Sequence, residues 1–583
     1  MEPSSEMFET IMYPTAAFAP PPSRVADASP DFESSALNPR NRLDSLELPK
    51  DLQWTIDDGD VDGVRFFAVP LFAIGKPPLR IDVYIPDQNL HPFALKQTLN
   101  SHKTLTTSGP QLTGLGICRL ILQKLHTWSA SHDDFEAVYW SLPFGSRIIF
   151  GGIHADINSI PIIIEPFYEV ERQWLSINQL RDLWKISEDR WPSVLDHSEL
   201  QLQRQIHEAI SIVKISSRWQ SETFVFKSVS TDVKYLYHEL KVLLTLEPHR
   251  HIIQRPLYIV AKKCSFGGKI GVCGFVLQYY PLGSLRHALE DQHTSGMLQA
   301  RDKVRLARQI LAALIHIQKS SLKFYTGIKP NNIVLSRSQG ITEAVLIDFE
   351  QRSAWCSWSP PEVYYVEFLE VLANSKRLDE ATRSKYSKIL EQFIPGWSPH
   401  KRKARYTESG QGYARVWQAM SPAHQESAQV YMFGKLLWCL FENVGFPSNY
   451  ITVETFREKM SDHPFPEFRR CPLQLRDCIT RCTAGAPERK GRQPYVVRVG
   501  DKLYRRVKGS SAADMNCGPE DVQAAARAWW EDEIKKAERY VAACTRRENE
   551  EPELGAAEIL RSIDERPTFQ ELHDLLAKIE AAL

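Results

Sequence analysis

Apolar and polar positions alternate along the chain with two periods, one typical of strands and one typical of helices. The clearest strand pattern is a pair of short apolar runs, Ile333–Leu335 and Ala344–Ile347, separated by the polar, glycine-containing segment 336–340. Apolar runs of this length joined by turn residues predict a β-hairpin. We therefore expect the two ends of this segment to lie side by side.

Chemically distinctive side chains flank this predicted hairpin. Lys329 and Asn332 precede the first strand, and Asp348 directly follows the second. Because a hairpin brings its two ends together, we expect these three side chains to face one point. Carboxylate and amide oxygens are the ligands that hard cations such as Mg²⁺ prefer, and a lysine offers a point charge to phosphate. The pattern therefore predicts a site for a phosphate and a divalent cation.

The same two periods recur through the rest of the chain and predict an α+β fold. Further strands are predicted at 64–72, 79–85, 146–150, 160–164, 223–228, 256–262 and 274–279. Helices are predicted at 112–128, 176–184, 198–212, 235–246, 302–318, 427–441 and 521–547. A second, basic hairpin over 495–507 is predicted to turn at Gly500-Asp501, and Thr568 with Glu571 has the spacing of a capping box.

Composition narrows the classes of protein to consider. The chain has 583 residues, of which 71 are Lys or Arg and 71 are Asp or Glu, so that the formal net charge is zero. This balance indicates neither a nucleic acid nor a membrane as a partner. No apolar run approaches the roughly 18 residues of a membrane span, and the first residues lack the order of a signal peptide. Ten cysteines occur without a C-x-x-C pair, which is typical of reduced thiols and not of zinc ligands. We expect an intracellular protein, cytoplasmic or nuclear.

The two polar clusters around the first hairpin resemble motifs of the protein kinase superfamily. Residues 325–332 read YTGIKPNN, against H-R-D-L-x-x-x-N in a kinase catalytic loop, and residues 348–350 read DFE, against D-F-G. The resemblance implies that Lys329 belongs to the catalytic loop and that Asn332 and Asp348 are metal ligands. It also puts Gly327 at the position of the catalytic Asp, so that this carboxylate is missing.

Upstream segments resemble the nucleotide-binding part of kinases. Lys227 on a predicted strand and Glu239 on the following helix match the pair that holds the α- and β-phosphates of ATP. The passage GFVLQYYPLGSL resembles a kinase hinge, with Leu277 at the back of the pocket. The hinge residues that the resemblance implies are Gln278, Tyr279 and Tyr280. The stretch 212–219, where the resemblance puts the glycine-rich loop, has no glycine. ATP and Mg²⁺ are the implied cofactors, and a nucleotide is the implied small-molecule partner.

Two further matches concern the larger, helical part of a kinase. Ser359-Pro360-Pro361-Glu362 resembles the A-P-E motif, and Arg566 in the sequence RPTF matches the arginine with which that glutamate pairs. A buried ion pair between Glu362 and Arg566 is therefore expected. Gln429 stands where kinases carry an Asp that ties down the catalytic loop.

The resemblance implies a bilobal protein-kinase-like fold, with a small β-rich lobe and a large helical lobe, preceded by a separate α+β N-terminal domain. The expected division is a disordered tail at 1–48, the α+β domain of unknown role at 49–205, the small lobe and hinge at 206–282, and the large lobe at 283–583. Two insertions are expected in the large lobe, at about 366–425 and about 484–558. The first contains the basic run 400–405, and the basic hairpin lies in the second.

Three functional hypotheses follow from the resemblance. The first is a pseudokinase, a scaffold or regulator that keeps ATP- and Mg-binding residues but has lost the catalytic Asp at Gly327. The second is a divergent, active Ser/Thr-type kinase that transfers the γ-phosphate of ATP to a protein hydroxyl, with Glu350 or Tyr325 as a replacement base. The third is an interaction protein that binds no nucleotide. The phrases IDFEQR, WSPPEV and VYMFGKLLWCLFE also resemble kinase-like proteins of filamentous fungi.

Overall fold

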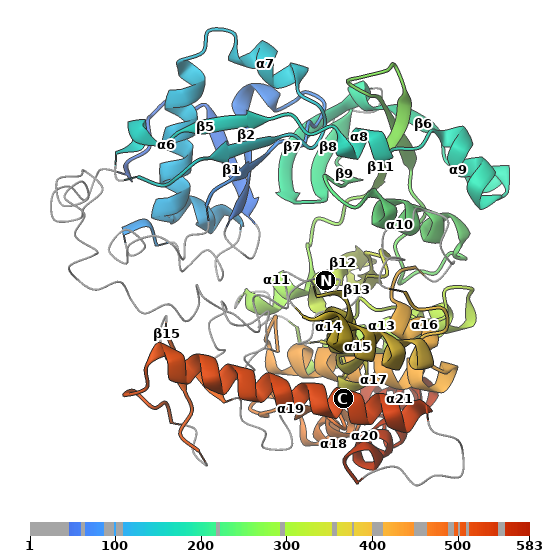
Figure 1. Ribbon diagram of the computed structural model, residues 1–583. Coiled ribbons are helices and arrows are strands. Elements are labelled where there is room, and N and C mark those ends of the chain that lie inside the picture. The colour runs from blue at the N-terminus through green and yellow to red at the C-terminus, as the bar shows by residue number, and fades with distance from the viewer. Residues whose placement is uncertain are drawn as a thin grey trace. The chain divides into compact units, whose positions relative to one another are not determined.

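The computed structural model shows a mixed α+β chain with several sheets (Figure 1). It describes residues 46–583 except 60–63, 87–97, 101–108, 155, 217–221, 292–297, 353–357, 376–377, 399–411, 448–462, 464, 488–494, 500–501, 509–511 and 546–553. The described residues form two compact units. The N-terminal unit lies within Ala19–Leu244 and Arg255–Tyr279, and the C-terminal unit comprises Thr245–Gln254 and Tyr280–Leu583.

The N-terminal unit begins with a five-stranded sheet whose strands follow one another in chain order. The strands are β1 (Trp54–Gly59), β2 (Arg65–Pro70), β3 (Asp82–Tyr84), β4 (Arg147–Phe150) and β5 (Ile162–Glu165), paired antiparallel except for the parallel pair β3–β4. Helix α6 (Gly116–Ala130) contacts β1, and α7 (Phe135–Ser141) follows it (Figure 1). Trp54 on β1 packs its ring against Phe135 and Tyr139 of α7, which closes a buried aromatic core.

A second sheet of six strands completes the N-terminal unit. Its order is β6-β10-β11-β9-β8-β7, where β6 is Val194–Asp196, β7 Leu200–His207, β8 Ile210–Ile215, β9 Phe224–Ser228, β10 Tyr258–Lys263 and β11 Ile270–Gln278. All neighbours are antiparallel except β6 and β10. Helix α10 (Val233–Thr245) follows β9 and is buried along most of its length; the short helices α8 (Glu169–Gln173) and α9 (Ile177–Trp184) precede the sheet.

The helix predicted over 198–212 is wrong, because these residues form the end of a 3-10 turn, strand β7 and the first half of β8. In β7 the apolar residues Leu200 and Leu202 are buried, and Gln201 between them and Gln203 after them are more exposed, which is the two-residue period of a strand. Two irregularities in the pairing with β8 break this period after Leu202, so that the later apolar residues fit a helical spacing as well. The domain boundary expected at 205–206 falls inside β7.

The two sheets of the N-terminal unit are joined by main-chain hydrogen bonds. Gly75 N–H donates to the Leu202 carbonyl (2.7 Å), and Leu202 N–H donates to the Lys76 carbonyl (2.8 Å). Gly75 has a φ of +79°, a conformation that only glycine adopts without strain. These bonds occupy the outer edge of β7, which is the last strand of its sheet. A separate N-terminal domain is therefore not confirmed, because both sheets belong to one compact unit.

The C-terminal unit is mostly helical and carries the predicted hairpin, β12 (Ile333–Ser338) with β13 (Ile341–Leu346). Its helices are α11 (Leu285–Glu290), α13 (Ala300–Lys319), α14 (Pro361–Asn374), α15 (Glu380–Phe393), α16 (Arg415–Ala419), α17 (Pro422–Glu442), α18 (Leu473–Cys482), α19 (Pro519–Thr545), α20 (Leu554–Asp564) and α21 (Phe569–Ala582). The helices predicted over 302–318 and 427–441 are confirmed as α13 and α17. The capping box of Thr568 and Glu571 is present at the start of α21.

The two expected insertions contact each other. Helices α14 and α15 from the first pack against α19 from the second, with Phe368 against Trp530 and Phe393 against Tyr540. The hairpin predicted in the second insertion is confirmed as β14 (Val496–Val499) with β15 (Lys502–Arg505). Its Arg505 forms ion pairs with Asp514 and Asp521 of the same insertion, so that this guanidinium is already partly neutralised.

Some expectations fall on residues outside the description. They concern the tail up to residue 45, residues 217–219 of the stretch expected to hold the glycine-rich loop, the basic run 400–405 and the turn at Gly500-Asp501. Among the described helices, none combines the length and the apolar character that crossing a bilayer requires.

Candidate functional site

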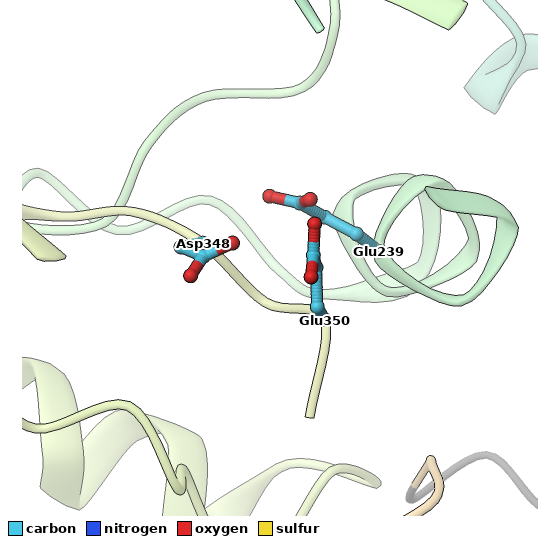
Figure 2. A group of neighbouring side chains, drawn as sticks. All are labelled: Glu239, Asp348 and Glu350. Carbon is cyan, nitrogen blue, oxygen red and sulfur yellow. The ribbon is translucent and has the colours of Figure 1, made fainter. Parts of the chain in front are cut away.

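The polar ends of the β12–β13 hairpin meet in the C-terminal unit, as predicted. The N–H of Ile347, after β13, donates to the carbonyl of Asn332, before β12 (3.0 Å). Asp348 follows directly and has a φ of +66°, a left-handed conformation that Asp tolerates better than most residues. The chain turns sharply there, and Figure 2 shows the carboxylates of Asp348 and Glu350 projecting from the same loop.

The Asn332 side chain is oriented by the loop that precedes it. Its amide Nδ2 donates to the carbonyl of Gly327 at 3.1 Å, and the residue is 7% exposed. This bond leaves the amide oxygen Oδ1 as the atom able to ligate a cation. An amide oxygen and the neighbouring Asp348 carboxylate match the oxygen ligands that Mg²⁺ prefers. The residues present therefore fit a divalent cation.

Tyr325, two residues before Gly327, holds this loop against Ile347, the residue that follows β13. Its hydroxyl donates to the Ile347 carbonyl at 2.6 Å, and its ring lies 5.1 Å from that of Phe349. Its backbone N–H donates to Oε1 of the fully buried Gln429 at 3.0 Å. Gln429 therefore anchors the loop through a neutral amide, at the position where kinases carry an Asp.

Gly327 has no room for a side chain. A Cβ atom built there would lie 2.7 Å from the Tyr325 hydroxyl and 2.8 Å from the Asn332 amide nitrogen, and real Cβ atoms essentially never come this close to another atom. The φ of Gly327 is not in the left-handed region, so the constraint is steric and not conformational. A residue with a side chain at position 327 would therefore require the Tyr325 ring or the Asn332 amide to shift.

The charged groups beside this loop are partly neutralised by one another. Glu350 is 8% exposed and forms an ion pair with Arg352 at 2.5 Å. Burial lowers the pKa of Lys329, while the carboxylates of Asp348 and Glu350 act in the opposite direction.

A side-chain bond that the sequence did not predict fixes the segment after Asp348. Gln351 also has a left-handed φ (+49°), and its amide oxygen accepts from Thr326 N–H (3.2 Å) while its Nε2 donates to the Phe324 carbonyl (2.8 Å). The two loops are thereby held together by a buried amide. A polar residue directly after the D-F-E motif was the only signal in the sequence.

In the N-terminal unit, Lys227 and Glu239 form the predicted ion pair. Lys227 lies on β9, opposite Phe275 of β11, and Glu239 lies on α10 (Figure 2). Lys227 Nζ is 2.5 Å from Glu239 Oε2, and the two side chains are 5% and 1% exposed. The prediction of the pair is confirmed, whereas its role towards phosphate stays a prediction.

The expected hinge residues lie at the end of β11 and directly after it, where the chain passes from the N-terminal unit to the C-terminal unit. Leu277 is buried and pairs with Val225 of β9, whereas Gln278 is exposed at the end of the strand. Tyr279 is the last residue of the N-terminal unit and Tyr280 is the first of the next stretch of the C-terminal unit. Burial raises the pKa of the Tyr280 hydroxyl, which is therefore neutral at physiological pH.

The stretch expected to hold a glycine-rich loop has a different structure. Of the stretch 212–219, residues 212–215 belong to strand β8 (Ile210–Ile215), and residues 217–219 lie outside the described residues. The hairpin turn lies before this strand, at Glu208–Ala209. His207 pairs with Ile210, so the connection has only two residues. A turn this short has no loop to lay over a ligand.

Glu362 and Arg566 form the predicted buried ion pair within the C-terminal unit. Both carboxylate oxygens accept from the guanidinium, Arg566 Nη2 donating to Oε2 at 3.1 Å, and the side chains are 1% and 0% exposed. Arg566 also donates to the carbonyls of Ser427 and Ala484. It therefore ties the start of α14 to α17 and to the end of α18.

The functional assignment rests on this geometry and not on a match to known proteins. No protein-family model matches the chain, and no curated protein matches it.

Proposed function

We propose that this protein is a pseudokinase, related in fold to protein kinases, that does not transfer phosphate and acts as a scaffold or regulator. The observation that carries the proposal is the closed packing around Gly327. The loop keeps the Lys329, Asn332 and Asp348 that the resemblance implies, but a hydroxyl and an amide occupy the space that a catalytic Asp side chain would need.

Without a carboxylate at position 327, the chain lacks the group that would accept the proton of a substrate hydroxyl. A positioned general base contributes about 10²- to 10⁴-fold to a reaction rate. Glu350 was one replacement base to consider, yet its carboxylate is buried and paired with Arg352. The other was Tyr325, whose hydroxyl proton is donated to the Ile347 carbonyl. Neither arrangement favours the active-kinase hypothesis.

The retained residues support binding of ATP and Mg²⁺ in the proposal. Asp348 and the Oδ1 atom of Asn332 would hold the cation, and Lys227, oriented by Glu239, would hold phosphate oxygens. The backbone at the end of β11, around Gln278 and Tyr279, would pair with the base. When bound, the cation would neutralise charge on the phosphates. These residues would therefore hold a nucleotide in the proposal, and position 327 supplies no carboxylate to take a proton.

One observation favours the third hypothesis, an interaction protein without nucleotide. Backbone N–H groups of a glycine-rich loop normally approach the phosphates closely, and here the corresponding connection is the two-residue turn Glu208–Ala209. Loss of this contact predicts weak phosphate binding. The two hypotheses differ only in whether a nucleotide binds.

The first experiment measures phosphate transfer. The purified full-length chain is incubated with γ-labelled ATP, Mg²⁺ or Mn²⁺ and a general protein substrate, beside the variant Asp348→Asn. We expect labelling of both proteins to be equal and at background. Labelling by the wild type that Asp348→Asn abolishes would contradict the pseudokinase proposal and establish an active kinase.

The second experiment measures nucleotide binding by thermal shift, with ATP in the presence and absence of Mg²⁺. Ligand at 100 times its dissociation constant stabilises a protein by roughly 2.7 kcal/mol. We expect a Mg²⁺-dependent shift that is lost in Asp348→Asn and reduced in Lys227→Met. The exposed Lys319→Met serves as a matched control. No shift at saturating ATP would leave the interaction-protein hypothesis in place of a nucleotide-binding pseudokinase.

A further inference from the structure

A network of buried charges lies between the two sheets of the N-terminal unit. Arg65 on β2 forms an ion pair with Asp82 on β3, and its Nε donates to the same carboxylate at 2.9 Å. Arg80 is fully buried and lies 3.5 Å from the other oxygen of Asp82. Two buried guanidinium groups therefore share one buried carboxylate.

This network extends from the first sheet to the β7–β8 turn. Arg65 Nη1 donates to the carboxylate of Glu208 at 2.8 Å, and Arg80 Nη1 donates to the carbonyl of His207 at 2.9 Å. Glu208 is one of the two turn residues, and Ala209, the other, is buried. Each guanidinium therefore contacts Asp82 and the turn through different nitrogen atoms.

Contacts from β1 and β3 hold the strand that enters the turn. The N–H of Gln205 donates to Asp57 of β1 at 2.8 Å, and its side-chain amide donates to Asp82 at 3.2 Å. Ser230, beyond β9, accepts from Arg65 at 2.8 Å. Three strands of the first sheet therefore bind the end of one hairpin of the second.

Aromatic rings on the first sheet fix the directions of these arginines. The Arg65 guanidinium lies between Phe67 and Tyr84, at 5.5 and 5.7 Å from the ring centroids, and Arg80 lies 5.5 Å from Phe67. Cations over ring faces are stabilised most where water is excluded. The excess of positive charge over Asp82 is matched by Glu208, the one carboxylate that the turn supplies.

We propose that the first sheet is an intramolecular clamp that fixes the β7–β8 turn through Arg65, Arg80 and Asp82, so that the turn cannot close over a ligand. The clamp itself stands on contacts within one unit, whereas its consequence for nucleotides rests on the proposed function. When ATP binds as proposed, the clamp keeps the turn away from its phosphates. The turn is then a fixed part of the sheet, and ATP should contact it no more than adenosine does.

Amide hydrogen exchange of the apo protein tests the clamp directly. In Arg65→Met, which keeps an unbranched chain but loses the charge and its bonds, we expect exchange in the peptide covering 203–212 to rise roughly ten- to hundred-fold. Losing a hydrogen bond to a charged group costs about 1.5–3 kcal/mol, which is a factor of this size in local opening. Glu208→Gln is the milder second variant should Arg65→Met not fold, and we expect a smaller rise in the same peptide.

The matched control is Arg147→Met on strand β4 of the same sheet. Arg147 stacks on Phe167 and Tyr84 and lies 3.5 Å from Glu165. Exchange over 203–212 should not change in this variant. Equal exchange over 203–212 in the wild type, Arg65→Met and Glu208→Gln would overturn the clamp.

Ligand titration separates the clamp from the proposed function. With Mg²⁺-ATP bound to the wild type, we expect exchange over 203–212 to stay as in the apo protein, while the thermal shift reports binding. ATP-dependent protection of this peptide in the wild type would overturn the clamp. Absence of any ATP-dependent shift would count against the nucleotide-binding proposal, while the apo exchange comparison would still decide on the clamp.

Discussion

Arg566 forms a two-point ion pair with Glu362, a residue 204 positions earlier in the chain, and neither side chain is exposed by more than 1%. The pair joins the first turn of α14 to the loop before α21. Because both charges are removed from water, each depends on the other for compensation. The pair is therefore a sensitive point of the C-terminal unit.

Removing one partner of this pair should destabilise the C-terminal unit strongly. We expect Arg566→Ala to lower its free energy of unfolding by about 3–5 kcal/mol, because Glu362 is left as an unpaired buried charge. Urea denaturation followed by tryptophan fluorescence measures the change. The control is Arg308→Ala, which breaks a half-exposed pair with Glu580 and should cost no more than about 1 kcal/mol. Equal effects of the two substitutions would contradict this ranking.

Gly327 and Tyr325 should be energetically coupled. Gly327→Ala forces a Cβ against the Tyr325 hydroxyl, and overpacking of this kind costs about 1–3 kcal/mol. Gly327→Asp should cost more and should not create kinase activity, since the carboxylate cannot occupy the loop as it stands. Denaturation curves of both variants measure the cost.

A double-mutant cycle with Tyr325→Ala tests the cause of that cost. With the ring removed, Gly327→Ala should be tolerated better, which gives a coupling energy of about 0.5–3 kcal/mol. Additive effects of the two substitutions would mean that the backbone, and not the Tyr325 side chain, resists a residue at position 327.

The Lys227–Glu239 pair should behave as a buried pair in the N-terminal unit. Lys227→Met alone should cost about 3–5 kcal/mol, because Glu239 keeps an uncompensated charge, whereas the double variant Lys227→Met/Glu239→Leu should recover most of that loss. Thermal denaturation of the three variants measures this recovery. A double variant as unstable as Lys227→Met would show that the pair is held by more than mutual compensation.

His197 should make the N-terminal unit sensitive to acid. It is 6% exposed, and burial lowers its pKa to about 4, with Lys262 acting in the same direction and the Pro78 carbonyl, Asp196 and Glu171 opposing. Its ordinary value is about 6.5, so the unfolded chain binds a proton that the folded chain does not between these two pH values. The contribution of His197 is thus complete above pH 6.5 and is lost as pH falls towards 4, by roughly 3 kcal/mol.

The variant His197→Gln tests this assignment, because glutamine keeps a polar group near the Pro78 carbonyl but does not titrate. Between pH 6.5 and 4, stability of the variant should fall less than that of the wild type. Exposed His132→Gln is the control, and its pH profile should follow the wild type. An unchanged slope in His197→Gln would assign the acid sensitivity to other groups.

Local sequence was sufficient for elements whose pattern matches one regular structure. The β12–β13 hairpin, α13 and α17 were predicted because their apolar period and turn residues agree over enough positions. The pairs Lys227–Glu239 and Glu362–Arg566 were also predicted, as the resemblance to kinase motifs implies, and for Lys227 the scarcity of buried unpaired charge agrees with it. Resemblance to kinase motifs supplied the partners, which spacing alone could not.

Other features depended on contacts between residues far apart in the chain. β7 was mistaken for a helix because irregular pairing with β8 blurs the two-residue period, and pairing is decided by the neighbouring strand. Glycine at 327 could be read as a loss of catalytic charge, but only the position of the Tyr325 ring shows that the space itself is filled.

By itself, the sequence determined the mixed α+β class, most of the regular elements and two buried ion pairs. Only the tertiary structure decided that the first sheet holds the β7–β8 turn, since Arg65 and Glu208 are 143 residues apart. The physical reason is that propensity and periodicity act over a few residues, whereas buried charges find their partners only after the sheets have packed. The clamp and the filled loop around Gly327 are both products of that packing.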